Sequence, residues 1–223
     1  MRLAAVALAL AAGSAGITGA ASAHGVRVSC RSGRTLFRSH GVRAFLITSY
    51  FAERGYRSPY QTFYVCRPHS PRPRAIFDGD PFTRAEASGF RVFGVRLGFV
   101  IHSEGFSNGS ATWVGWLDLR IGRLRVGLIN AGENAEPGEP LVLDSYVTFA
   151  IADDGAVAVM GSEAARGSLQ QEVDLLEVAA NALGPPKPLF MTSRGGLDPS
   201  SIAITGTSVT WRTATGQVQS VPR

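Results

Sequence analysis

The sequence predicts an all-β protein, built as a small propeller-like array of about four antiparallel, four-stranded blades. A turn that ends in glycine, followed by a run rich in β-branched and aromatic residues, recurs four times, with the glycines at positions 41, 94, 155 and 206. Further β-rich runs follow each turn, and no segment after residue 25 shows the periodicity of a long amphipathic helix. The same hairpins could instead build an open all-β sandwich.

Each repeat supplies a hairpin and then its outer strands. The repeats cover about 30–80, 88–130, 141–193 and 200–223 of one domain that spans residues 24–223. Repeats of about 50 residues made of four strands are typical of propeller blades. The expected third strands are Gln61–Arg67, Trp113–Arg120, Glu172–Ala179 and Gln217–Val221, and the expected fourth strands are Arg74–Asp78, Arg123–Ile129 and Pro188–Thr192.

Two stretches carry a resemblance to a known family of repeats. The segments DDGAVAV, over Asp153–Val159, and WLDLRIGR, over Trp116–Arg123, resemble the two halves of TolB-like (WD40-like) propeller repeats. The likeness covers all four units loosely and is best in the second and third. It implies a propeller architecture and, at most, a protein-interaction or ligand-binding scaffold of the cell envelope, because fold does not fix function.

The N-terminal segment has the composition of a secretory signal peptide. A positive charge at Arg2 precedes an apolar stretch over 3–12, and a small-residue stretch closes with Ala-Ser-Ala at 21–23. We therefore expect residues 1–23 to be removed before His24 and the protein to be secreted or otherwise extracytoplasmic. No membrane span is expected after cleavage, because no later apolar run approaches the roughly 20 residues that a span needs.

The two cysteines are expected to form one structural disulfide, Cys30 to Cys66, as is usual in an exported chain. A reactive thiol pair would normally show a closer spacing such as C-x-x-C. Chain-entropy arithmetic gives the loop between them a stabilising effect of roughly 3–4 kcal/mol.

Charge is distributed very unevenly along the chain. Residues 24–74 hold ten arginines and one acid, a net charge of +9, whereas residues 130–180 hold one arginine and ten acids, a net charge of −9. A chain of this kind is strongly dipolar. We expect an anionic envelope polymer, a glycan or a protein as partner, with self-association as a further possibility and no nucleic acid. The predicted basic patch consists of Arg67, Arg72 and Arg74.

A candidate ligand-binding loop lies between the second and third strands of the first repeat. The segment Ser49–Tyr60 interleaves aromatic rings with guanidinium groups, which can stack on and hydrogen-bond to sugars, peptides or anionic polymers. The equivalent segments of the second and third repeats, over 102–111 and 161–171, would emerge on the same face. In the alternative interpretation the tyrosines pack the loop onto its own blade. The candidate residues are Tyr50, Arg54, Tyr56, Arg57 and Tyr60.

No constellation of catalytic residues stands out. The segment over 105–109 matches G-x-S-x-G, but a strand is expected after it where a hydrolase elbow needs a helix. The four histidines lack metal-ligand spacing, and no metal or other cofactor is expected. The sequence therefore favours a secreted, non-catalytic binding or interaction protein. The alternative is a secreted propeller-type hydrolase or lyase that acts on an extracellular polymer.

Overall fold

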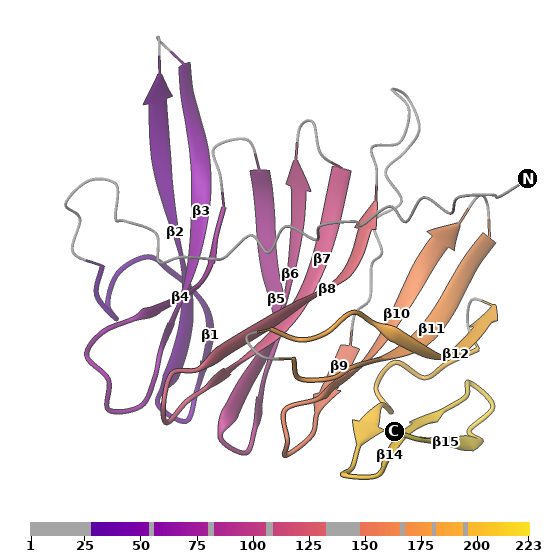
Figure 1. The fold of residues 1–223 in the computed structure, drawn as a ribbon. Helices are drawn as coiled ribbons and strands as arrows, with labels where there is room; N and C mark the ends of the chain where they lie inside the picture. The colour runs from indigo at the N-terminus through magenta and orange to yellow at the C-terminus, as the bar shows by residue number, and fades with distance from the viewer. Residues whose placement is uncertain are drawn as a thin grey trace, which may run out of the picture.

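The described part of the chain consists of strands and their connections, without a helix (Figure 1). The structure, a computed structural model, describes residues 28–53, 56–79, 83–105, 109–132, 148–165, 168–179, 182–193 and 196–223. The predicted signal peptide, residues 1–23, lies outside these ranges. The strands form four antiparallel sheets, so the predicted all-β fold class is confirmed.

Each sheet is a meander in which consecutive strands are neighbours. The first sheet contains β1 (Arg34–Ser39), β2 (Val42–Glu53), β3 (Tyr56–Cys66) and β4 (Arg74–Asp78), and the second contains β5 (Thr83–Phe93), β6 (Arg96–Gly105), β7 (Gly109–Asp118) and β8 (Leu124–Gly132). The third contains β9 (Thr148–Ile151), β10 (Val157–Ala165), β11 (Ser168–Leu176) and β12 (Lys187–Ser193), and the last contains β13 (Ala203–Ile204), β14 (Ser208–Arg212) and β15 (Val218–Pro222).

The predicted glycine turns connect the first two strands of every sheet. Between β1 and β2 the turn has only two residues, His40 and Gly41, and both have positive φ angles, 47° and 76°. This is the backbone shape whose twist matches that of the flanking strands, which explains why a glycine stands here. In the turn between β9 and β10, Gly155 has a φ of 95°.

The sheets pack face to face through three buried clusters. Leu46 and Phe63 of the first sheet meet Leu97 of the second. Side chains alternate across a strand, so Val100 of the same strand, β6, faces the third sheet and packs with Leu176 there. A third cluster joins the third sheet to the last, with Trp211 of β14 fully buried.

The three clusters connect the sheets in chain order. In Figure 1 the first sheet (indigo) and the last sheet (yellow) lie at opposite ends of a row. Within the described ranges, no buried cluster joins β15 and its sheet to the first sheet. The arrangement is therefore an array of four stacked sheets with two outward-facing end surfaces.

Guanidinium groups also connect neighbouring sheets. Arg67, at the end of β3, donates a hydrogen bond of 3.1 Å to the carbonyl oxygen of Arg120 in the second sheet. Arg96, at the start of β6, donates to the carbonyl oxygens of Ala152 (3.1 Å) and Asp153 (2.7 Å) in the third sheet. These bonds satisfy turn carbonyls that pack against the next sheet, so part of the basic composition serves the stacking itself.

Candidate functional site

The first sheet carries a two-stranded arm that extends beyond its neighbours. Strand β1 pairs with β2 only as far as Leu46, and β4 pairs with β3 only as far as Thr62. Beyond these points β2 and β3 continue as a pair up to Glu53 and Tyr56. We call the hairpin over 47–61 the arm; Figure 1 shows it projecting past the edge of the first sheet.

The arm replaces the loop that the sequence predicts over Ser49–Tyr60. Eleven consecutive cross-strand pairs join β2 to β3 without a register shift, so the two strands form a regular antiparallel pair up to Glu53 and Tyr56. The other two expected connections behave alike, since β6 and β7 pair to Gly105 and Gly109, and β10 and β11 to Ala165 and Ser168. Four of the candidate residues therefore lie on strands, whose backbone holds them more rigidly than a loop would: Tyr50, Tyr56, Arg57 and Tyr60.

One face of the arm carries a stacked aromatic and guanidinium pair. The guanidinium carbon of Arg57 lies 4.2 Å from the centre of the Tyr50 ring, a cation–π contact. Both side chains are exposed, Tyr50 at 54%. They share the face on which Leu46 and Phe63 pack against the second sheet, because the cross-strand register continues unbroken along the hairpin. This pair therefore lies above the junction of the first two sheets.

The opposite face of the arm is also aromatic. Phe51 is 41% exposed there, and Tyr60 is partly buried. Further down the same face, Tyr64 stacks on Phe45 with ring centres 5.4 Å apart. Burial and, secondarily, the nearby Asp78 carboxylate raise the pKa of Tyr64 above its ordinary value. Aromatic side chains thus continue from the buried base of the sheet onto the arm.

Two of the sequence-predicted residues are incompletely placed. Arg54 lies outside the described residues, and Tyr56 is described only through its backbone, as the last partner of Glu53 in the ladder. The structure brings together Tyr50 and Arg57 on one face and sets Tyr60 on the other.

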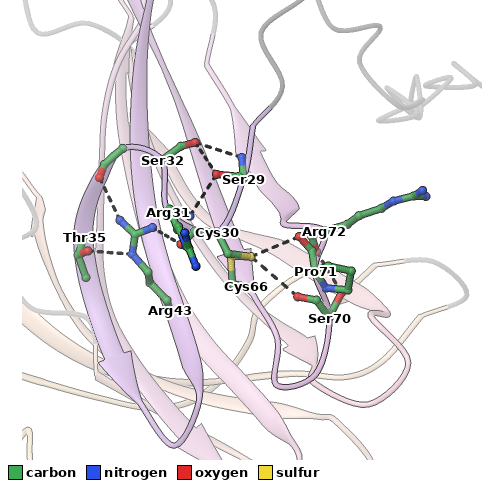
Figure 2. The surroundings of a disulfide bond; sticks show 11 residues. Ser29, Cys30, Arg31, Ser32, Thr35, Arg43, Cys66, Ser70, Pro71 and Arg72 are labelled. Carbon is green, nitrogen blue, oxygen red and sulfur yellow. Dashed lines mark hydrogen bonds between the residues drawn. A yellow bond between two sulfur atoms is a disulfide. The ribbon is translucent and has the colours of Figure 1, made fainter.

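The predicted disulfide is present at the base of the same sheet (Figure 2). The Cα atoms of Cys30 and Cys66 are 5.7 Å apart, and the Cys30 sulfur contacts the carbonyl oxygens of Ser70 and Pro71 at 3.9 Å. The bond fixes the segment before β1 against the end of β3. A disulfide indicates an oxidising, extracytoplasmic environment.

Sequence reasoning did not identify Arg43, which is 9% exposed and holds the same segment. Its guanidinium donates to Thr35 Oγ1 (2.9 Å), to the Gly33 carbonyl oxygen (3.0 Å) and to the Cys30 carbonyl oxygen, as Figure 2 shows. It also lies 4.6 Å from the centre of the Phe45 ring. The disulfide and Arg43 together cover the lower part of the outward face of the first sheet.

The predicted basic patch lies at the other end of the first sheet from the tip of the arm. Arg57 and Cys66 are nine residue-to-residue steps apart along β3, roughly 30 Å at about 3.3 Å per step. Arg72 and Arg74 are exposed near the start of β4. Arg67 is partly buried and engaged with the second sheet, so it stabilises the stack as well as contributing charge.

One histidine and one carboxylate meet on the second sheet. His102 Nδ1 is 3.1 Å from Thr112 Oγ1, and His102 Nε2 is 3.6 Å from Glu104 Oε1. The described ranges contain no group of three metal-ligating side chains.

Neither the strands nor their connections, as far as they are described, include a helix that could span a membrane. No protein-family model, no curated protein and no solved structure matches this chain.

Proposed function

We propose that this protein is an extracytoplasmic, non-catalytic binding protein that holds its ligand on the arm. The observation that carries the proposal is the exposed Tyr50–Arg57 pair on a hairpin that extends beyond its sheet. An aromatic ring with a guanidinium group stacked on it offers an apolar surface and directed hydrogen-bond donors in one place. Such a surface suits a protein segment, a glycan or an anionic envelope polymer.

The rigidity of the arm supports this role. Because the side chains stand on paired strands, less conformational entropy is lost when a ligand binds than for a mobile loop. The disulfide supports an extracytoplasmic location, where such a ligand would be met. Secretion by the signal peptide over 1–23 is part of the proposal.

The experiment compares the mature protein, residues 24–223, with a Tyr50→Ala, Arg57→Ala double variant on glycan and peptide arrays. The matched control is Arg212→Ala, Val218→Ala, because these residues are also an exposed cross-strand pair, on the last sheet. We expect the array signals of the wild type to be lost in the arm variant and kept in the control, with equal melting temperatures. Absence of any array signal from the wild type, or equal signals from both variants, contradicts the proposal.

A further inference from the structure

The two long edges of the arm differ in their backbone chemistry. Hydrogen-bonded and non-hydrogen-bonded pairs alternate along an antiparallel ladder, and Gln61 pairs with Thr48. The Gln61 carbonyl oxygen points away from β2, because it accepts a hydrogen bond from the Gly79 amide. The backbone groups of residues 48, 50 and 52 on β2, and of residues 57, 59 and 61 on β3, therefore point outward, away from the partner strand. A further strand could add only through these outward groups.

The β3 edge of the arm is closed to strand addition. Position 59 on this edge is a proline, which has no backbone N–H to offer a further strand. Below it, the Gln61 carbonyl oxygen already accepts a hydrogen bond of 2.9 Å from the Gly79 amide. Prolines on edge strands are a common means of preventing unwanted pairing.

The β2 edge of the arm is open. From Ile47 to Glu53 it contains no proline, no lysine and no register shift, and no described strand pairs with it there. Thr48, Tyr50 and Ala52 thus present three N–H and three C=O groups along one line.

The chain itself leaves this edge open by turning away at Gly33. This residue has a φ of 69°, and a Cβ atom here would overlap the carbonyl oxygen of Leu46. From Gly33 the preceding segment runs to Cys30, where the disulfide and Arg43 hold it against the outward face of the sheet. A shallow depression of about 390 Å³ marks the point of departure, and its lining is Ser32, Gly33, Arg34, Leu46, Ile47 and Thr48.

Side chains on both faces of the open edge would contact an added strand. Tyr50 and Phe51 are consecutive, point to opposite faces and are both exposed. An added strand would place alternate side chains beside each ring, which is how strand-addition sites combine backbone affinity with side-chain selectivity.

The charge of the neighbourhood identifies the kind of strand that fits. Arg34, opposite Leu46 at the foot of the edge, and Arg57 both lie on the face of Tyr50 and are exposed. A second copy paired edge to edge would bring these cationic groups together, which is unfavourable. We propose that the open edge of β2 binds an extended, acidic segment of a partner protein by strand addition. This inference rests on the proposed function of the arm and specifies its ligand class.

The probe is a fluorescein-labelled, end-blocked peptide of sequence ETVEVTE, followed by fluorescence anisotropy. The test variant is Ala52→Pro, which removes one outward N–H of β2 and leaves the ladder to β3 intact. The matched control is Ala52→Thr, which keeps that N–H. We expect the wild type and Ala52→Thr to bind the peptide. The affinity of Ala52→Pro for the peptide should be lower by a factor of about ten or more. The charge-reversed peptide KTVKVTK, and the first peptide N-methylated at its three central amides, should bind about tenfold more weakly or not at all.

Amide hydrogen exchange reports the pairing directly. Saturating peptide should slow exchange at Thr48, Tyr50 and Ala52 in the wild type. Unchanged exchange at these amides, or equal peptide affinity of Ala52→Pro and Ala52→Thr, overturns strand addition.

The two proposals can fail separately. If array ligands depend on Tyr50 and Arg57 while the acidic peptide shows no binding at about 1 mM, strand addition is wrong and the proposed function stands. If no ligand depends on Tyr50 and Arg57, both are wrong. Equal binding of ETVEVTE and KTVKVTK overturns the acidic preference.

Discussion

The guanidinium of Arg223 lies 2.7 Å from a carboxylate oxygen of Asp154, which joins the end of the last sheet to a turn of the third. Burial alone would raise the pKa of Asp154, but the hydrogen bond from Arg223, with that from the Ala156 amide, outweighs it and holds the pKa below its ordinary value of 3.8. The last sheet is thus attached to the third sheet by this ion pair as well as by the buried side chain of Trp211.

Acid should weaken this link. A carboxyl group whose pKa is lowered in the folded state stabilises the fold above its unfolded pKa, and the effect is lost as the pH falls through the folded value. Asp154→Asn should therefore lower the free energy of unfolding at pH 7 by less than about 1 kcal/mol, because the carboxylate is 59% exposed, and the difference should vanish well below pH 3.8. Denaturant unfolding across pH measures this, with Asp153→Asn in the same turn as control. A difference from the wild type that grows toward low pH contradicts the assignment.

Loss of the disulfide should destabilise the first sheet. Replacing Cys30 and Cys66 by alanine opens the covalent loop between them, whose ends are 36 residues apart in the sequence. The free energy of unfolding should fall by about 3–4 kcal/mol. Urea unfolding of oxidised wild type, reduced wild type and the double variant measures it. The reduced protein and the variant should agree, and a variant as stable as the oxidised protein would show that the segment before β1 is held by other contacts alone.

Arg43 should matter nearly as much as the disulfide. Arg43→Met leaves the carbonyl oxygens of Cys30 and Gly33 without their donor, and we expect a loss of about 2–3 kcal/mol. Arg38→Met, an exposed arginine opposite it on β1, should have little effect. Arg43 and the disulfide hold the same segment. The free energy of unfolding lost when both are removed should therefore be smaller than the sum of the two separate losses. Strict additivity in a double-mutant cycle contradicts this coupling.

Close packing between the second and third sheets should forbid a side chain at position 98. A Cβ atom on Gly98 would overlap Phe149 and lie 2.8 Å from Ile151 Cδ1. Gly98→Ala should therefore cost about 1–3 kcal/mol through overpacking. Gly206→Ala, where a Cβ meets nothing within 4 Å, is the matched control. Thermal unfolding compares them, and equal melting temperatures would mean that the sheets can move apart without cost.

The basic patch should bind anionic polymer in a salt-sensitive way. Poly-L-glutamate retention on the immobilised protein should fall steeply between about 0.05 M and 0.5 M salt, as the Debye length shrinks from about 14 Å to about 4 Å. Arg72→Ala, Arg74→Ala should weaken retention with unchanged stability, whereas Arg67→Ala should also lower the melting temperature, because Arg67 bonds to the second sheet. Retention that does not respond to salt contradicts a role for charge.

Local sequence signals predicted the strands, the turns and the disulfide. Glycine turns between β-rich runs act over a few residues, and two cysteines allow a single pairing. The arm was missed because the stretch from Ile47 to Glu53 extends beyond its neighbours. Tyr50 and Phe51 lie on opposite faces and are both exposed, so the stretch lacks the apolar alternation that indicates a strand.

The arginines that hold the sheets together show a second limit. The motif Gly-Val-Arg occurs at two of the hairpin turns, over 41–43 and 94–96. In the first copy the glycine is the second residue of the turn, and in the second copy it is the first. This one-residue offset sends Arg43 to the outward face of its sheet and Arg96 toward the next sheet. Identical residues thus stabilise different contacts, which a repeat alignment alone would not reveal.

Pro59 limits the number of strands that can add to the arm. A ribbon with two open edges can accept a strand on each side and so grow into a fibre, as exposed edge strands are prone to do. Because Pro59 closes one side of the arm, addition through it stops at a single strand per molecule. The arm can therefore keep an exposed, aromatic, strand-shaped surface without becoming a template for continuous polymerisation.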